Sequence, residues 1–342
     1  MEQLKELVKK LSALYGTSGD EEAVRNAIIE RLPSDVNYEV DNLGSIIARK
    51  KGAKTPAKKL MMAAHMDEVG FIVTYINEDG TLSFAPVGGI LPAVVFGRQL
   101  VFRNGVHGAV AGKALHLLKS EEKEVQPKLS DLRIDIGADS REDAEKLVSV
   151  GDCAYFAGEQ LDFGDGFMAG KALDDRVGCA VMLELLNKEL PYDCTFVFTV
   201  QEEIGTRGAA AAAYSVNPDL AVVLETTTAC DISGVEGEKK VCVLGEGPVV
   251  SYMDRSTIYD RELYRLAFDT AKELDIKCQT KSVVAGGNDS GAIHKAAGGV
   301  RTVAVSLPCR YLHSPSCVIK ESDLFDSAKL AEALIGKLGA LQ

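Results

Sequence analysis

The sequence predicts an α/β fold in which a sheet is covered by helices on both faces and a small β domain is inserted. Outside the middle of the chain, buried strand-like runs such as 60–64 and 220–224 alternate with segments of helical periodicity. Between 70 and 162, short apolar runs are broken by glycines and show little helical periodicity. We therefore expect residues 1–69 and 163–342 to form one α/β domain around the inserted domain.

The N-terminal part supplies two helices and three strands. Apolar residues at helical spacing from Leu4 to Leu14 predict the first helix, and a second is expected from Glu21, with Ser18 and Glu21 forming a capping box. Strands are expected near 36–40, 45–49 and 60–64. The last of these delivers His65 and Asp67 at its end.

The C-terminal part continues the alternation. The expected elements are, in order, a helix over 176–188, a strand over 195–200, a helix from Gly208, a strand over 220–224, a β stretch over 241–250, a helix over 259–274, a strand near 281–284, a helix from Asp289, a strand over 301–307 and a helix over 321–338. In sheets of this kind, working residues collect at strand ends.

Composition and net charge indicate which kinds of binding partner the sequence disfavours, namely strongly anionic ones. With 46% apolar residues in 342, the chain can bury at least one large core. Fifty acidic against 38 basic residues give a formal charge of -12, which disfavours nucleic-acid and anionic-membrane partners. No apolar run approaches the roughly 20 residues of a membrane-spanning helix, and the first residues predict an amphipathic helix, so we expect a cytoplasmic protein. Eight cysteines without a Cys-x-x-Cys pair suggest neither a zinc ribbon nor a redox motif.

Two adjacent aspartates, Asp174 and Asp175, stand between glycines just before an apolar run. Neighbouring carboxylates repel each other unless a cation, either a metal ion or a buried arginine, lies beside them. A helix cap explains one aspartate but not both. We expect Asp174 to bridge two metal ions and Asp175 to orient the site by bonding to a ligand histidine or to Arg176.

The other candidates follow strand-like runs. His65 and Asp67 point to one face, where the aspartate can fix the histidine tautomer. Glu202 and Glu203 point in different directions, so one can bind metal while the other serves as a general base. The last two candidate ligands are Glu225 and His313.

Two histidines and three carboxylates make a donor set that suits zinc, cobalt or manganese better than calcium or magnesium. Two ions sharing Asp174 and a water would lower the pKa of that water from about 15.7 to about 7. No Gly-x-Ser-x-Gly elbow, Walker loop, dinucleotide fingerprint or His-Glu-x-x-His helix occurs in the sequence.

With these motifs assembled, the chain resembles the cytosolic co-catalytic metallo-aminopeptidases that include the glutamyl aminopeptidases and the tetrahedral (TET) aminopeptidases, some of which are labelled CelM-type endoglucanases. The resemblance covers nearly the whole length. It depends on the segments 16–21, 65–67, 170–176, 201–203, 286–289 and 311–314.

The resemblance implies a three-layer, zinc-peptidase-like domain with a PDZ-like insert used in dimerisation, and dimers assembled into a hollow dodecamer. It assigns one ion to His65, Asp174 and either Glu225 or Glu203, the other ion to His313 and the remaining glutamate, and the role of general base to Glu202. The family often has aspartate in place of Glu225 and threonine in place of Asn288.

The leading hypothesis is removal of N-terminal residues from short peptides by a metal-bridging water. A metal-independent glycosidase is an alternative because paired carboxylates also cleave sugars, although the absence of tryptophan speaks against sugar binding. A non-catalytic, metal-stabilised scaffold is the third hypothesis. If the Arg310 side chain faces the substrate, we expect the enzyme to prefer peptides whose N-terminal residue is acidic.

Overall fold

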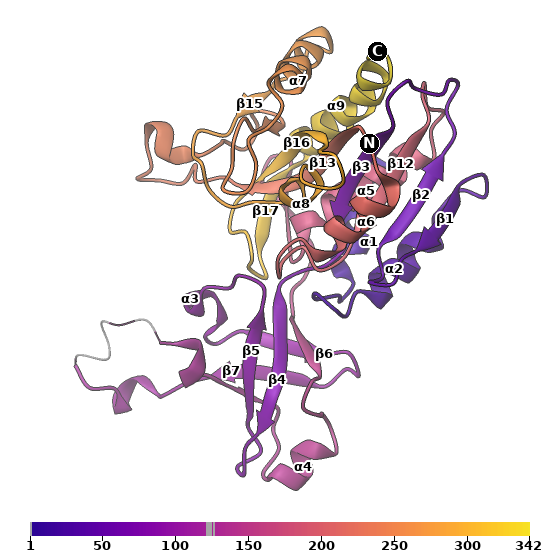
Figure 1. Cartoon of the computed structure of the whole chain (residues 1–342). Coiled ribbons are helices and arrows are strands. Elements are labelled where there is room, and N and C mark those ends of the chain that lie inside the picture. The colour runs from indigo at the N-terminus through magenta and orange to yellow at the C-terminus, as the bar shows by residue number, and fades with distance from the viewer. Residues whose placement is uncertain (1, 121–124, 126) are drawn as a thin grey trace.

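The computed structural model describes residues 2–120, 125 and 127–342. An eight-stranded mixed sheet forms the centre of the larger part of the molecule (Figure 1). Its strands in spatial order are β1 (Asn37–Val40), β2 (Ile46–Lys50), β12 (Cys194–Thr199), β3 (Leu60–His65), β13 (Leu220–Thr228), β16 (Arg301–Cys309), β14 (Val249–Val250) and β15 (Gln279–Thr280). Strands β12, β3, β13 and β16 run parallel, and both halves of the sequence contribute to them.

Helices pack on both faces of this sheet. Successive side chains of each buried strand point to opposite faces, so both faces are apolar. One face packs with residues of α1 (Glu2–Ala13), α2 (Glu22–Ile29), α5 (Leu173–Leu186), α7 (Arg261–Glu273) and α9 (Glu321–Gly339). The other face packs with α6 (Arg207–Val216) and α8 (Ser290–Ile293). Met62 and Met61, which are neighbours on β3, belong to these two separate cores.

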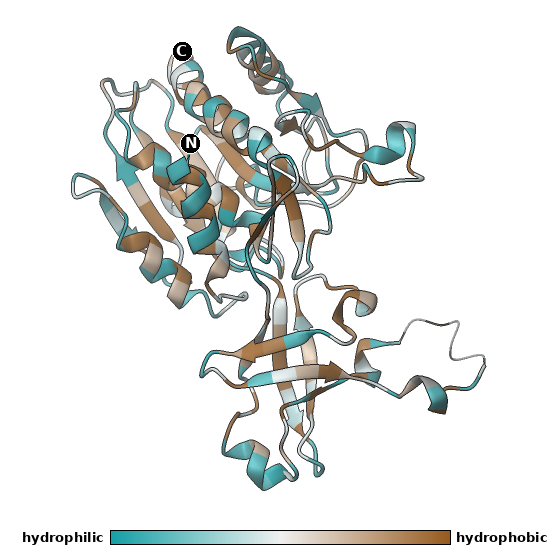
Figure 2. Cartoon of the chain, turned by 180° about the vertical axis from the view of Figure 1, so that it is seen from behind, coloured by the Kyte–Doolittle hydropathy of each residue, from teal (hydrophilic) through white to brown (hydrophobic). Residues whose placement is uncertain are grey.

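A closed barrel lies beside the sheet (Figure 1). Its strands in spatial order are β4 (Gly70–Ile76), β5 (Leu82–Val87), β8 (Arg133–Asp135), β7 (His107–Ala111), β6 (Gln99–Phe102) and β9 (Cys153–Phe156). The short helices in the described residues of this segment are α3 (Pro92–Val95), α4 (Arg141–Glu145), η1 (Leu115–Leu117) and η3 (Leu129–Asp131). The barrel has an apolar core of its own, which includes Phe71, Leu100 and Ile134. Figure 2 shows apolar residues along both the sheet and the barrel strands.

A three-stranded sheet, which the sequence did not predict, pairs the segment that follows the barrel with a strand near the C-terminus. It consists of β10 (Leu161–Phe163), β11 (Phe167–Gly170) and β17 (Cys317–Lys320). Because β11 and β17 are antiparallel, Gly170 is opposite Cys317. The segment before Asp174 is thereby held next to the segment after His313.

Several local predictions were wrong. The capping box does not form, because the Ser18 hydroxyl donates to Asp67 and the Glu21 carboxylate accepts the N–H groups of Gly19 and Gln201. No strand forms at 281–284, because the short β15 ends at Thr280, whereas the helix expected from Asp289 is confirmed as the single turn α8. Most of 241–250 lies outside the strands, with only β14 pairing and the turn η4 (Gly237–Lys240) before it. Long-range side-chain bonds override the local propensities in these loops.

None of the helices in the described part of the chain has both the length and the apolar character needed to cross a bilayer. All eight cysteines are free thiols.

Candidate metal centre

The predicted site residues gather at the carboxyl ends of the parallel strands. His65 is the last residue of β3 and lies in register with Thr199 of β12, so Glu202 and Glu203 begin just beyond the same edge. Glu225 lies inside β13, which extends past its predicted end. This edge, where strand β3 lies between β12 and β13, is where open α/β sheets place their ligands.

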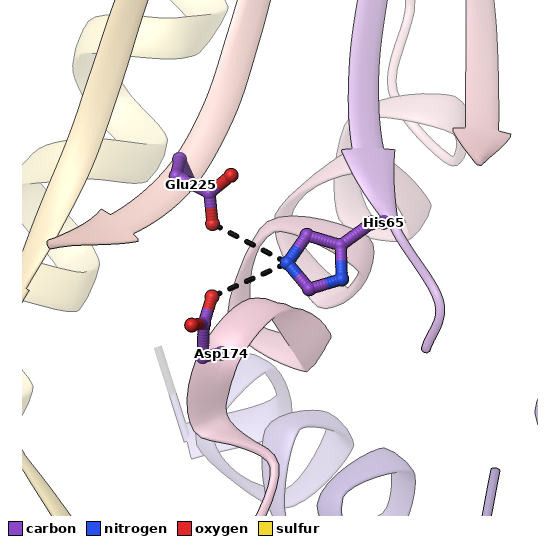
Figure 3. Close-up of side chains that lie close together, drawn as sticks. All are labelled: His65, Asp174 and Glu225. Carbon is purple, nitrogen blue, oxygen red and sulfur yellow. Dashed lines mark hydrogen bonds and ion pairs between the residues drawn. The ribbon is translucent and has the colours of Figure 1, made fainter. Parts of the chain in front are cut away.

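The first group of ligand atoms is His65, Asp174 and Glu225 (Figure 3). The Nε2 atom of His65 lies 3.3 Å from Asp174 Oδ1 and 3.4 Å from Glu225 Oε1. The three side chains come from β3, the start of α5 and β13, and all three are buried. They point toward one common position between them.

The second group shares its aspartate with the first. His313 Nε2 lies 3.4 Å from Asp174 Oδ2 and 3.3 Å from Glu203 Oε1. In each group the potential ligand atoms lie within 4.8 Å of one another. Asp174 therefore presents one carboxylate oxygen to each group. Of the two ligand divisions left open by the sequence, the geometry matches the one that pairs His65 with Glu225.

Asp67 holds both glutamates of the 202–203 turn in place. Its Oδ1 atom accepts the backbone N–H of Glu202 at 3.0 Å, and its Oδ2 atom accepts the N–H of Glu203 at 3.1 Å. The Nδ1 atom of His65 lies 3.1 Å from the carbonyl oxygen of Asp67 and 3.4 Å from Oδ1. An N–H at Nδ1 leaves the lone pair of Nε2 facing Asp174 and Glu225.

Asp175 lies behind the first group. Its Oδ1 atom accepts the N–H of Gly178 at 3.0 Å. A Cβ at Gly178 would stand 2.5 Å from Oδ2, so glycine is required there for the carboxylate to fold back onto the helix. The alternative bond from Asp175 to Arg176 was wrong, because the buried guanidinium donates to the carbonyl of Met66 and other main-chain oxygens and to Glu68.

The electrostatics of the site call for added positive charge. Burial raises the pKa of Glu225 and Glu202 well above the usual range, and the neighbouring carboxylates add to the effect. Burial also opposes ionisation of Asp174, but hydrogen bonds from His313 and His65 outweigh it and hold the pKa of Asp174 well below its usual range. The two imidazoles thus keep Asp174 ionised but do not offset the burial of Glu202 and Glu225, whose anionic forms further cations would stabilise. The donor set of imidazole and carboxylate fits divalent zinc, cobalt or manganese.

The two adjacent glutamates differ in their surroundings. Glu203 lies against His313, whereas no hydrogen bond or salt bridge holds the Glu202 carboxylate in the part of the chain that the structure describes. Both line a cavity of about 480 Å³ that opens beside the two groups. The Glu202 carboxylate is therefore available to a molecule in this cavity.

The barrel contributes to the site, which the sequence did not indicate. The Nδ1 atom of His313 lies 2.7 Å from the carbonyl oxygen of Gly89, in the loop that follows β5. Donation to this carbonyl leaves the Nε2 lone pair facing Asp174 and Glu203. Leu91 and Val94 from the same segment line the cavity.

A second unpredicted contact joins the segment that leads from the sheet into the barrel to the segment that leads back from the barrel. The buried ammonium of Lys171 donates to Glu68 at 2.7 Å and to the carbonyl of Leu14 at 2.5 Å. Burial lowers the pKa of Lys171 to about 8, against the opposing effect of Glu68. Residues 68 and 171 lie three positions from His65 and Asp174, respectively, so this ion pair fixes the spacing of two candidate ligands.

Comparisons with known proteins identify the relatives of this chain. The family model described as M42 glutamyl aminopeptidase matches residues 44–330. A putative aminopeptidase of Acetivibrio thermocellus is 42% identical over 96% of this chain and 97% of its own length. The glutamyl aminopeptidase of Lactococcus lactis is 34% identical over 98% of this chain and 97% of its own.

Solved structures match over the same extent. An aminopeptidase from Desulfurococcus kamchatkensis superposes with a TM-score of 0.92 at 34% identity, covering 98% of this chain and 94% of the other. The TET1 peptidase of Pyrococcus horikoshii, described as assembling into a tetrahedron or a large octahedral shell, gives a TM-score of 0.85 at 32% identity, covering 97% and 99%. The chain has a mixed α/β fold that matches these aminopeptidases, and it belongs to the M42 glutamyl aminopeptidase family of metallo-aminopeptidases.

Proposed function

We propose that this aminopeptidase removes N-terminal residues from short peptides at a site for two divalent ions, zinc or cobalt in preference to manganese. One ion would be held by His65, Asp174 and Glu225, and the other by Asp174, Glu203 and His313. The observation that carries the proposal is the position of Asp174, whose two oxygens face two separate histidine–carboxylate groups.

When bound, the ions supply Lewis acidity for the scissile carbonyl and for a nearby water. Glu202 is the general base in this proposal, because its carboxylate lines the cavity and has no partner among the described residues. It accepts the proton of the attacking water and then delivers it to the leaving amine. Asp67 orients His65 and sets the position of Glu202 through its backbone N–H. Water and peptide must lie within about 3 Å of this carboxylate for the transfer.

The barrel is proposed as a PDZ-like dimerisation domain spanning residues 70–162, inserted into a three-layer, zinc-peptidase-like catalytic domain made of residues 1–69 and 163–342. Dimers are proposed to assemble into a dodecamer. Support comes from the separate core of the barrel and from the shell-forming TET1 peptidase that this chain resembles. Light scattering on the purified protein tests the assembly.

The activity is tested with a panel of aminoacyl-p-nitroanilides and short peptides on metal-free protein reloaded with zinc, cobalt or manganese. We expect release of N-terminal residues only after reloading. Cellulose cleavage in excess EDTA without peptidase activity would instead identify a metal-independent glycosidase. Loss of thermal stability on metal removal, with no turnover of any substrate, would identify a metal-stabilised scaffold.

The contact between barrel and His313 leads to a separate prediction. Gly88 has a φ of +90°, and a Cβ there would stand 2.8 Å from Val69 Cγ1 and 3.2 Å from Glu203 Cβ. Gly88→Ala should therefore displace the loop that presents the Gly89 carbonyl, and we expect kcat/KM to fall by about 10- to 100-fold. The measurement is steady-state kinetics of the reloaded enzyme.

Gly105→Ala is the matched control, because Gly105 has a φ of +86° on another barrel turn and a Cβ there would meet nothing within 4 Å. Both variants place alanine at a positive φ, so their backbone strain is similar and only Gly88→Ala adds the clash. Equal loss of kcat/KM in the two variants would show that strain, not the contact with the site, explains the effect.

A further inference from the structure

The loop of residues 16–21 lies against the candidate metal centre, although it supplies none of the candidate ligands. Thr17 forms a parallel β-bridge with Glu68, and its hydroxyl donates to the main-chain carbonyl of Glu68 at 2.8 Å. The N–H of Gly16 donates to the Glu68 carboxylate at 3.1 Å. Because Glu68 directly follows Asp67, these bonds bring the loop beside the aspartate that orients the site.

Two side chains of this loop reach the site. The Ser18 hydroxyl donates to Oδ2 of Asp67 at 2.6 Å, and the same oxygen accepts the N–H of Glu203. The Oε1 atom of Glu21 accepts the N–H of Gln201 at 3.1 Å. Ser18, Glu21 and Asp67 are all buried. These bonds connect a loop near the N-terminus with a turn that lies 180 residues later in the chain.

The turn that contains the proposed general base depends on acceptors outside itself. Gln201 has a φ of +57°, a conformation that residues other than glycine adopt infrequently. Its N–H bonds to Glu21. The N–H groups of Glu202 and Glu203 bond to the two carboxylate oxygens of Asp67. Three consecutive N–H groups are therefore held by two buried carboxylates, in an arrangement that directs Glu202 toward the cavity.

Ser18 supplies the side-chain hydroxyl that fixes Asp67. The Asp67 carboxylate is fully buried, so the donors around it determine its orientation. Without the hydroxyl, Oδ2 would retain the Glu203 N–H as its donor among the described residues. The carboxylate would then be free to rotate away from the position that both N–H groups of the turn require.

The other side of the loop is anchored in the barrel. Asp20 accepts a hydrogen bond from the Tyr155 hydroxyl of β9 and pairs with Arg103, which follows β6. These contacts hold the loop independently of Ser18. Removal of the Ser18 hydroxyl should therefore change the position of Asp67 and not that of the loop.

We propose that Ser18 is a positioning residue, which acts through Asp67 to place Glu202 for proton transfer. This inference rests on the proposed aminopeptidase function of the same site. Ser18 does not line the cavity, so its contribution reaches the substrate only through the turn. A displacement of about 1 Å in a catalytic group can lower a rate by about 100-fold. Loss of the hydroxyl is therefore expected to lower kcat and to leave KM nearly unchanged.

The test compares Ser18→Thr with Ser18→Val, because these two side chains have the same shape and differ in the hydroxyl. In the metal-loaded enzyme we expect kcat for the best p-nitroanilide to be about 10- to 100-fold lower in Ser18→Val than in Ser18→Thr, with a similar KM. Ser18→Ala, which adds no atoms, should show the same loss relative to the wild type. The visible absorption of the cobalt-loaded protein should also differ between Ser18→Thr and Ser18→Val, because the ligand Glu203 moves with the turn.

Thr270→Val is the matched control, because it removes another buried hydroxyl that donates at 2.6 Å, here to the carbonyl of Leu266 within α7. We expect this variant to keep its kcat, while the Tm of the metal-free protein falls about as much as in Ser18→Ala. Equal kcat and equal cobalt spectra in Ser18→Thr and Ser18→Val would overturn the inference. So would an equal fall of kcat in Thr270→Val and Ser18→Ala, since that result would assign the effect to stability.

Failure of the metal-loaded wild type on every peptide and nitroanilide would instead reject the proposed function itself. The cobalt spectra of Ser18→Thr and Ser18→Val would in that case still decide whether the Ser18 hydroxyl positions the turn that contains Glu203.

Discussion

Glu202→Gln is expected to lower kcat by about 100- to 10,000-fold while the protein still binds its metal ions. Glutamine preserves the size of the side chain but cannot accept a proton from water. Because the Glu202 carboxylate has no partner among the described residues and its backbone N–H remains bonded to Asp67, the substitution should leave the turn intact. Metal content by atomic absorption and turnover of the best nitroanilide, measured on the same sample, check this result.

Glu30→Gln is a suitable control, since Glu30 is an exposed residue at the end of α2, remote in sequence from every candidate ligand. Near-normal turnover in metal-loaded Glu202→Gln would remove Glu202 from the mechanism. Loss of metal together with turnover would mean that Glu202 is a ligand, and the division of roles between Glu202 and Glu203 would then be wrong.

Asp174→Asn is expected to abolish stable binding of both ions, whereas Glu225→Gln should mainly weaken one. The reason is the geometry: Asp174 faces His65 with one oxygen and His313 with the other, while Glu225 belongs to a single group. Asparagine removes the negative charge from both groups and replaces one oxygen by an amide that cannot coordinate. Metal content after dialysis against a weak chelator checks the difference.

Glu203→Gln is the complementary variant, because Glu203 belongs only to the group that contains His313. It should also lose mainly one ion. If Asp174→Asn loses no more metal than Glu225→Gln or Glu203→Gln, Asp174 is not shared. Circular dichroism of the variants separates loss of ligands from loss of fold.

The candidate residues at strand ends were predictable because each is a polar side chain directly after an apolar, strand-like run. His65 and Glu225 each follow an apolar run that a sheet buries, and a polar side chain at that position has no packing role. Parallel strands then bring their carboxyl ends to one edge, so residues far apart in sequence meet there. The adjacent Asp174 and Asp175 indicated a cation for the same reason, since repulsion between them needs compensation.

What the sequence did not reveal depends on contacts between distant backbone segments. The Gly89 carbonyl that accepts from His313 carries no side-chain signal, and β17 is a short strand with no alternating pattern. Nothing in the local sequence around Lys171 and Glu68 indicates that the fold buries both side chains as an ion pair. Ser18 followed by Glu21 has the local pattern of a capping box, but its hydroxyl is used by Asp67 instead.

The central claim is that Asp174 joins two metal sites. The most direct measurement is anomalous diffraction from crystals of the zinc-loaded protein. We predict two zinc peaks per chain, each about 2.0–2.2 Å from a different carboxylate oxygen of Asp174, one next to His65 and Glu225 and the other next to Glu203 and His313. A single peak at full occupancy, or two peaks of which only one contacts Asp174, would contradict the account.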